Sequence, residues 1–245
     1  MQARALLFDL RVFAEMDIDY LQASKFLEGG GSSGLLPTRD ILKKLSETSQ
    51  KVPKEGYSEW INKVTDALDE IETEQIGNFQ LHMGVKSGLE SLQSMGLSIY
   101  VLTETGKKAE EKFLSQHSIG QYINEVIARD GAEGIGDLGK RLEVALEKLK
   151  LLPEECVYFC NRLSDLKTAK SRNFRTIILP SRKEKINNLI AEGSDGMIIS
   201  LEEIPSLLLT ESFKPTATEV ENVENLENKE VEGVAAEKTE LEEHV

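Results

Sequence analysis

The chain has 245 residues, of which 40% are hydrophobic and 29% charged, and its formal net charge is -14. This balance predicts a soluble globular protein and argues against nucleic-acid wrapping, because phosphate contacts need Lys and Arg clustered on one face. No apolar stretch reaches the roughly 20 residues that span a bilayer, and the N-terminus lacks the regions of a signal peptide. We therefore expect a cytoplasmic protein with neither a membrane nor a nucleic-acid partner.

The first predicted element is an apolar strand from Ala3 to Leu10, which contains Asp9 near its end. Continuous apolar runs are typical of buried parallel strands, whose carboxyl ends form the edge where open α/β sheets bind ligands. Asp9 is therefore either a site residue or a strand-ending or helix-capping acid. Arg11 follows two residues later and places a positive charge beside this candidate.

The interval from 14 to 80 interrupts the strand pattern. It contains two helical patterns, from Leu35 to Thr48 and from Tyr57 to Gln75, but no convincing strand. The glycine-rich stretch from Gly29 to Gly34 is not followed by Gly-Lys-Ser/Thr, so we interpret it as a flexible connector rather than a phosphate-binding loop. We expect residues 14–80 to form a helical cap inserted after the first strand.

From residue 81 onward, apolar strand patterns alternate with amphipathic helical patterns, which predicts an α/β fold with a doubly wound parallel sheet. The core then comprises residues 1–13 and 81–209. Strands are expected at Leu97–Thr103, Glu125–Arg129, Cys156–Cys160, Thr176–Pro180 and Gly196–Ser200, and helices at Val85–Met95, Lys107–Gln116, Lys140–Leu149, Asp165–Arg172 and Lys183–Ala191.

The acidity of the chain is concentrated in its last residues. From Glu211 to Val245 there are eleven Glu and three Lys, a net charge of -8. Such a segment, with few aromatic residues and no sustained helical stripe, is typical of a disordered region. We expect residues 210–245 to be an acidic tail that either keeps the protein soluble or binds a protein partner.

Polar and charged residues follow the predicted strand ends in a series. Asp9 ends the first strand and Thr103 the second, Lys140 opens a helix, and Asn161 follows the Cys156 run with Asp165 four residues later. This order and spacing resembles the haloacid dehalogenase superfamily of phosphatases and dehalogenases, in particular its phosphoglycolate-phosphatase-like branch. The resemblance covers about residues 1–209 and implies a Rossmann-like core with a helical cap.

The resemblance also implies a mechanism, in which Asp9 attacks phosphorus and becomes an aspartyl phosphate. Thr103 and Lys140 would neutralise the phosphoryl oxygens, an electrostatic effect that commonly dominates catalysis. Alternatives stay open for both residues. The alternative for Thr103 is that it caps the helix that starts near Lys107. The alternative for Lys140 is that it is a solvated helix lysine and that Arg141 takes its place.

Two residues depart from the family's pattern. Family phosphatases place a second aspartate, the general acid, where this chain has Arg11, and arginine cannot serve as an acid at neutral pH. The implied magnesium ligands are Asp9, Asn161 and Asp165, and an amide is a weaker ligand than a carboxylate for this hard cation. We therefore expect a weak or absent Mg²⁺ site, with Arg11 paired to Asp9 or Asp165.

Three functions remain open at this point. The first is hydrolysis of a small phosphate ester through Asp9, with reduced activity because the general acid is missing. The second is a catalytically inactive member that binds a small phosphorylated metabolite, another anion or a protein partner. The third is a metal-independent dehalogenase. The four-residue step from Asn161 to Asp165 counts against this function, because it is the spacing of the family's phosphatases.

Overall fold

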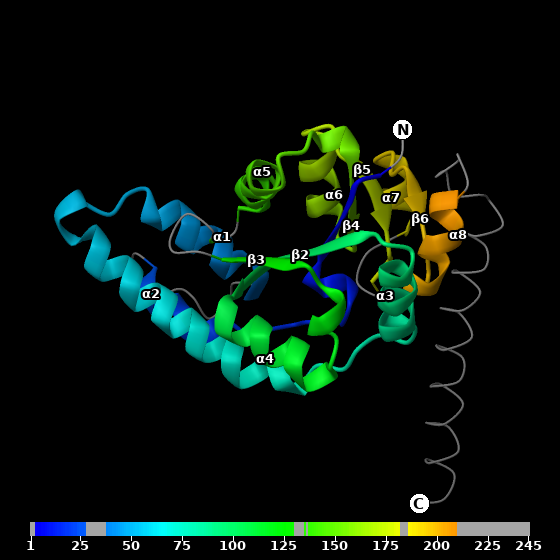
Figure 1. The fold of residues 1–245 in the computed structure, drawn as a ribbon. Coiled ribbons are helices and arrows are strands. Elements are labelled where there is room, and N and C mark those ends of the chain that lie inside the picture. Colours follow the sequence, from blue (N-terminus) through cyan, green and yellow to red (C-terminus); the bar gives the residue numbers. More distant parts are fainter. Residues whose placement is uncertain (1–2, 28–37, 130–134, 136, 182–185, 210–245) are drawn as a thin grey trace, which may run out of the picture.

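A parallel sheet of six strands forms the centre of the computed structural model, and helices cover both of its faces (Figure 1). The structure describes residues 3–27, 38–129, 135, 137–181 and 186–209. The predicted fold class, a doubly wound α/β sheet with helices inserted after the first strand, is confirmed. The strands are β1 (Ala5–Asp9), β2 (Ser98–Gly106), β3 (Glu125–Arg129), β4 (Cys156–Cys160), β5 (Arg175–Ile178) and β6 (Gly196–Met197).

The order of strands across the sheet is β3-β2-β1-β4-β5-β6, so β1 lies in the middle between β2 and β4. The carboxyl ends of these three adjacent parallel strands therefore meet at one edge of the sheet. The helices are α1 (Thr38–Ser49), α2 (Lys54–Gln75), α3 (Val85–Ser94), α4 (Lys107–His117), α5 (Leu138–Leu149), α6 (Leu163–Lys170), α7 (Ile186–Ala191) and α8 (Ile204–Leu209).

Alternate residues of β1 belong to two hydrophobic cores, one on each face of the sheet. Leu6 and Phe8 pack in the core that also contains buried residues of α2, α3, α4 and α8. Ala5 and Leu7 pack in the second core, with α5, α6 and α7. Figure 1 shows the same division, with α5 and α6 on one side of the sheet and α3 and α4 on the other. All five residues of β1 are buried, which explains its uninterrupted apolar sequence.

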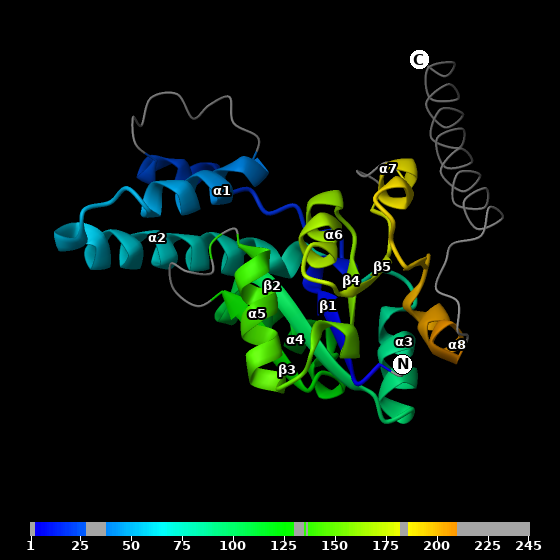
Figure 2. The ribbon, with the colours of Figure 1, turned by 90° about the horizontal axis from the view of Figure 1, so that it is seen from above.

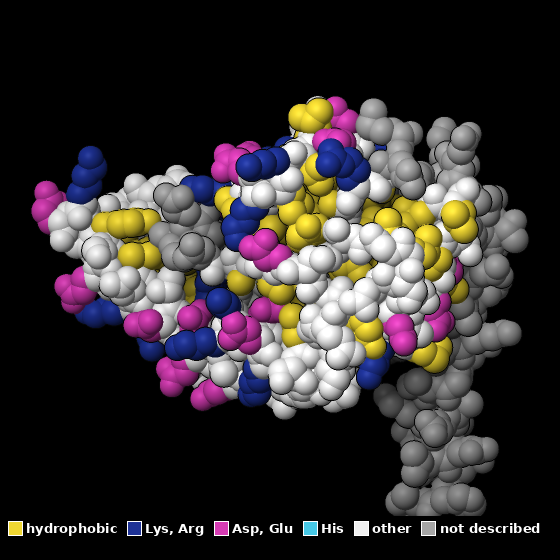
Figure 3. All heavy atoms as spheres, viewed as in Figure 1, with side chains coloured by type: hydrophobic (Ala, Val, Ile, Leu, Met, Phe, Trp, Pro, Cys, Tyr) yellow, Lys and Arg dark blue, Asp and Glu magenta, His cyan; other side chains and the backbone are white. Residues whose placement is uncertain are grey.

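The helices α1 and α2 lie at one end of the sheet, beyond β2 and β3 (Figures 1 and 2). Helix α2 packs against α4 and β2, and a 3-10 segment at Leu21–Phe26 contacts both α1 and α2. In the space-filling view, basic and acidic side chains are interspersed over the side of the molecule where α2 lies (Figure 3). This pattern is typical of a solvated helix face.

A buried group of polar residues ties α2 to the edge of the sheet, and we call it the sheet-edge cluster (Tyr20, Asp69, Glu72, Gly106 and Arg129). The Glu72 carboxylate is fully buried and accepts from Arg129 Nη1 at 2.8 Å and Nη2 at 3.0 Å. Tyr20 Oη and the Gly106 backbone N–H donate to the same carboxylate at 3.0 and 2.7 Å. Arg129 Nη2 also donates to Asp69 Oδ1 at 2.5 Å.

Two strand ends differ from the sequence-based expectation by three residues, more than any other strand end. Strand β2 was expected to end at Thr103 but continues to Gly106, because its register against β3 shifts after Leu102 and Gly106 then pairs with Arg129. Strand β6 was expected to reach Ser200 but ends at Met197. The Ser200 side chain caps the following 3-10 turn instead, by accepting from the backbone N–H of Glu202.

Several expectations lie outside the described residues or stay predictions. The glycine-rich stretch 29–34 and the acidic segment 210–245 lie outside the part of the chain that the structure describes. The boundaries of the core at 1–13 and 81–209, and of the cap at 14–80, stay predictions. Among the described residues, no helix combines the length and apolar character needed to cross a membrane.

Candidate functional site

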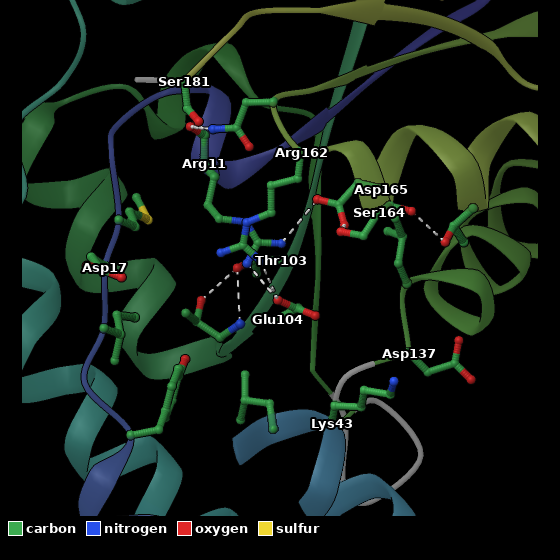
Figure 4. Close-up of a pocket in the computed structure, with 18 of the residues that line it drawn as sticks. Arg11, Asp17, Lys43, Thr103, Glu104, Asp137, Arg162, Ser164, Asp165 and Ser181 are labelled. Carbon is green, nitrogen blue, oxygen red and sulfur yellow. Dashed lines mark hydrogen bonds and ion pairs between the residues drawn. The ribbon is translucent and has the colours of Figure 1, made fainter. Parts of the chain in front are cut away.

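A cavity of about 730 Å³ lies at the carboxyl ends of β1, β2 and β4. Its walls come from segments far apart in the sequence, and they include Arg11 after β1, Thr103 and Glu104 in β2, Arg162 after β4, and Lys43 on α1. Figure 4 shows the Arg11 and Arg162 side chains reaching the same place beside Glu104. The predicted strand ends therefore meet in one cavity.

Asp9 ends β1 with a side chain that is only 3% exposed. Its Oδ1 accepts from the backbone N–H of Arg11 at 2.9 Å, and its Oδ2 accepts from Arg11 Nη2 at 3.0 Å and from Tyr158 Oη at 3.4 Å. Arg11 lines the cavity, whereas Asp9 is not among the described residues that line it. The arginine thus stands between the carboxylate and the cavity.

The Arg11 guanidinium contacts three carboxylates at once. Nη1 lies 2.6 Å from Glu104 Oε2, and Nη2 lies 3.0 Å from Asp9 Oδ2 and 3.6 Å from Asp165 Oδ2. Burial by itself would lower the pKa of Arg11, but the three carboxylates outweigh it and raise that pKa well above its usual value. The expected pairing with Asp9 or Asp165 is present with both residues.

Glu104 is the acceptor on which three arginines converge. Its Oε2 lies 2.6 Å from Arg11 Nη1 and 3.7 Å from Arg162 Nη1, and its Oε1 lies 3.3 Å from Arg141 Nη2. Burial would raise the pKa of the Glu104 carboxyl, but the three arginines hold it far below its usual range. We call Asp9, Arg11, Glu104, Arg141, Arg162 and Asp165 the cavity cluster.

Asp165 is the acid of the cavity cluster with the weakest cation contact. It lies in the first turn of α6, is 7% exposed, and accepts from Ser164 Oγ at 3.1 Å. Burial raises the pKa of Asp165 to about 6, with Asp9 and Glu104 adding to the effect and Arg11 opposing it. With Asp165 ionised, three carboxylates balance three guanidinium groups in this cluster.

The described residues do not fit a magnesium ion. Asn161 Nδ2 donates to the backbone carbonyl of Arg11 at 2.8 Å, so this oxygen already has a hydrogen-bond donor. The Arg11 guanidinium lies between Asp9 and Asp165, where a cation would meet positive charge instead of a ligand. No group of three or more His, Cys, Asp or Glu side chains in the described residues is arranged to hold a metal ion.

Thr103 and Lys140, the residues predicted to neutralise phosphoryl oxygens, differ in their placement. Thr103 is 3% exposed, lines the cavity, and shares a hydrogen bond of 2.7 Å with the Thr105 hydroxyl. Lys140 is half-buried in the first turn of α5, where its backbone N–H is capped by Asp137, and it is not among the described residues that line the cavity. Arg141, the alternative to Lys140, contacts Glu104. The roles of Asp9, Arg11, Thr103 and Lys140 stay predictions.

Two further residues at the site carry no role in the sequence-based prediction. Tyr158 lies in the middle of β4 and donates a hydrogen bond to Asp9. In the sequence it is one residue of an apolar run, and nothing there distinguishes it from its neighbours. Arg162 precedes α6 and reaches Glu104 across the cavity. The sequence signal for Arg162 is its position directly after Asn161, at the carboxyl end of a predicted strand.

The model of the haloacid dehalogenase-like hydrolase family matches residues 14–179, which is more than half of the chain. The chain belongs to the haloacid dehalogenase-like hydrolase family. The match begins after Asp9 and Arg11, so the segment that departs most from the family's pattern lies outside it. No curated protein sequence matches this chain.

Solved structures with a haloacid dehalogenase-like fold resemble this one at low sequence identity. A predicted phosphatase from Clostridium acetobutylicum is 15% identical, with a TM-score of 0.63 over 85% of this chain and 99% of that chain. A haloacid dehalogenase-like hydrolase from Streptococcus pneumoniae is 15% identical, with a TM-score of 0.59 over 83% and 97%. CbbY from Rhodobacter sphaeroides, solved in complex with phosphate, is 19% identical, with a TM-score of 0.54 over 83% and 96%. These likenesses show the fold.

Proposed function

We propose that this family member binds a small phosphorylated metabolite or another anion without magnesium-dependent hydrolysis. The observation that carries the proposal is the position of Arg11, whose guanidinium contacts Asp9, Glu104 and Asp165 together. A nucleophile must reach phosphorus with a free oxygen, and both oxygens of Asp9 accept hydrogen bonds from Arg11.

The cavity nevertheless retains groups suited to an anion. Arg11 and Arg162 line it, and so does Lys43 on α1, which has no ion pair with any described residue. The Thr103 and Thr105 hydroxyls add neutral donors. The structural neighbour CbbY was solved with phosphate, which supports an anion as the ligand class. A protein partner for residues 210–245 stays a prediction.

The competing function is slow hydrolysis through Asp9. It is favoured by the retention of Asp9 at the end of β1, where it pairs in register with Leu102, the residue before Thr103. Without a general acid at position 11, turnover is expected to be about 10²- to 10⁴-fold slower than with one. Metal-independent dehalogenation is the third hypothesis, and it too would depend on Asp9.

Activity assays separate these functions. We would measure phosphate release from p-nitrophenyl phosphate and from a panel of sugar and organic-acid phosphates, with and without Mg²⁺, and halide release from 2-haloacids. The proteins are the wild type, Asp9→Asn, and the double variant Arg11→Asp/Asn161→Asp. Arg4→Asp, which changes an exposed arginine paired with Glu155, makes the charge change of Arg11→Asp away from the site.

We expect no Asp9-dependent turnover by the wild type and no Mg²⁺ binding by calorimetry, but binding of at least one phosphorylated compound from the panel. The double variant restores two acids and is expected to gain both Mg²⁺ binding and phosphatase activity, whereas Arg4→Asp gains neither. Wild-type turnover that disappears in Asp9→Asn would establish an enzyme and overturn the proposal.

A further inference from the structure

Glu104 lines the cavity at a point where three arginines meet. It lies on β2 directly after Thr103, and its carboxylate lines the cavity together with Arg11 and Arg162. The three arginines that contact it come from different parts of the chain: the turn after β1, the first half of α5, and the residue before α6. Three separate elements thus deliver one guanidinium each to a single carboxylate.

Two of these arginines are largely buried, and the third is partly exposed. The side chains of Arg11 and Arg141 are 13% and 4% exposed, and that of Arg162 is 34% exposed. Guanidinium groups present several N–H donors in a fixed plane that suits carboxylate and phosphoryl oxygens. Arg11 Nε is in addition a buried donor with no hydrogen-bond acceptor in the described structure. The cluster therefore offers more donors than the two oxygens of Glu104 use.

A second acid of the same cavity shows that this arrangement is not a general property of its walls. Glu15 also lines the cavity and is half-buried, but it has no ion pair with any described residue. Among the described residues, Glu104 is therefore the one carboxylate that all three arginines share, and Arg11 also contacts Asp9 and Asp165. This specific convergence is what a built oxyanion site requires.

We propose that Arg11, Arg141 and Arg162 form an oxyanion site, that Glu104 fills this site as an internal ligand, and that an anion entering the cavity binds by displacing Glu104. The inference rests on the proposed function, because it names the place and the competitor of the anion bound there. The ligand class is a small carboxylate or a phosphoryl group that carries about one negative charge at the site.

Charge balance sets the class of ligand that the site would bind. With Glu104 in place, three guanidinium groups face the carboxylates of Asp9, Glu104 and Asp165, and the sum is zero. Without Glu104, the remaining groups sum to +1, and buried uncompensated charge is strongly unfavourable. One negative charge from outside restores the balance. Acetate supplies a carboxylate and inorganic phosphate supplies a phosphoryl oxyanion, so the two probes distinguish the sources.

The test is rescue of a Glu104 variant by these two anions, measured as thermal stability of the full chain. In Glu104→Ala the site is open, and acetate or phosphate is expected to raise the Tm by roughly 3–6 °C when it reaches about ten times its Kd. In the wild type the site is filled, so the rise is expected to be smaller. Glu104→Gln keeps the size of the side chain and serves as a second variant if the alanine protein does not fold.

Matched variants control for charge and for general anion effects. Glu15→Ala removes an acid from the same cavity but leaves the contacts of the three arginines in place. The Tm rise of this variant therefore measures the general stabilisation by anions that are excluded from the protein surface, without binding at the site. Combining Glu104→Ala with Arg162→Gln is expected to abolish the rescue. Combining it with Arg172→Gln, a cavity arginine that pairs with Glu143 instead, is expected to leave the rescue intact.

The outcomes are distinguishable from those of the proposed function. Rescue of Glu104→Ala beyond Glu15→Ala, lost with Arg162→Gln, supports the oxyanion site, and the stronger of the two anions identifies its chemistry. Equal shifts in Glu104→Ala, Glu15→Ala and wild type overturn the site, even where the wild type binds a phosphorylated compound elsewhere in the cavity. Asp9-dependent hydrolysis by the wild type would overturn the proposed function alone.

Discussion

The sheet-edge cluster and the cavity cluster are both buried groups of arginines and carboxylates, but they differ in how completely their polar atoms are paired. In the sheet-edge cluster, each oxygen of Glu72 accepts two hydrogen bonds, from Arg129 and from either Tyr20 or Gly106. In the cavity cluster, Arg11 Nε and Asp165 Oδ2 are buried without a hydrogen-bond partner.

This difference separates a structural role from a binding role. A buried ion pair contributes to stability only when further hydrogen bonds satisfy its remaining donors and acceptors, as they do around Glu72. Buried groups that keep open donors and acceptors beside a cavity are costly for folding and are typical of sites that receive a ligand. The sheet-edge cluster therefore holds α2 on the sheet, and the cavity cluster is the candidate binding site.

The largest expected effect is the loss of Arg129. Its side chain is 2% exposed, and Arg129→Met would leave the fully buried Glu72 carboxylate without its cation. Removal of one partner of a buried pair commonly costs about 3–5 kcal/mol, and we expect a loss of that size in the free energy of unfolding, measured with urea. Lys148→Met, which breaks the exposed pair between α5 and Glu125 of β3, is expected to cost less than about 1 kcal/mol. Equal losses in the two variants would contradict a structural role for the cluster.

A carboxylate outside both clusters sharpens the comparison, because no arginine contacts it. Glu110 on α4 is 2% exposed, and its Oε1 has no hydrogen-bond partner among the described residues. Burial raises the pKa of Glu110 to about 7, with Glu111 adding to the effect and Lys107 opposing it. The folded protein thus keeps a proton on Glu110 that the unfolded chain releases near pH 4.5.

Stability from this proton is present below pH 4.5 and is lost as the pH rises to about 7. We expect the stability of Glu110→Gln, relative to the wild type, to rise by about 2–3 kcal/mol between pH 4 and pH 8. Urea unfolding at both pH values measures it. Glu111→Gln changes the exposed neighbour, with a side chain that is 62% exposed, and is expected to show no such rise. A constant difference between Glu110→Gln and the wild type would show that the pKa of Glu110 is the same in the folded protein and in the unfolded chain.

The sequence was sufficient for the fold and for the location of the cavity cluster. Continuous apolar runs such as Cys156–Cys160 set the buried strands, and residues after those runs necessarily gather at one sheet edge. Arg11 and Asn161 could also be recognised as departures from the family's pattern, because a guanidinium carries positive charge and an amide is a weaker magnesium ligand than a carboxylate.

The sheet-edge cluster could not be predicted, because its members come from four distant segments and each has an ordinary local role. Glu72 and Asp69 occur in an acidic helix pattern, and Arg129 ends a strand. The convergence of Arg141 and Arg162 on Glu104 likewise depends on how α5 and α6 pack against the sheet. Such side-chain pairing across elements leaves no periodic signal in the sequence.

The loss of Arg11 is expected to cost less than the loss of Arg129. Arg11→Met removes the cation between Asp9 and Asp165, but Arg141 and Arg162 still contact Glu104, and the cavity admits water. We therefore expect a loss of about 1–3 kcal/mol in the free energy of unfolding, below the usual cost of breaking a closed buried pair. Arg4→Met, on the exposed pair with Glu155, is the control for removing an arginine. A loss larger than that of Arg129→Met would assign the main structural role to the cavity cluster.

The smallest effect is expected from a methyl group added inside the sheet-edge cluster. A Cβ at Gly106 would overlap Asp69 Oδ1 and lie 3.1 Å from Arg129 Nη2. The Asp69 side chain is 33% exposed and can turn toward solvent, which leaves the pairing between Arg129 and Glu72 in place. Gly106→Ala should then lower the free energy of unfolding by about 1 kcal/mol, which is near the contribution of one partly exposed ion pair. Gly56→Ala on α2, where a Cβ meets no atom within 4 Å, is expected to be neutral or stabilising by up to about 1 kcal/mol. A loss at Gly106 as large as that of Arg129→Met would mean that Asp69 cannot move, and that Asp69 is as essential to the cluster as the buried pair itself.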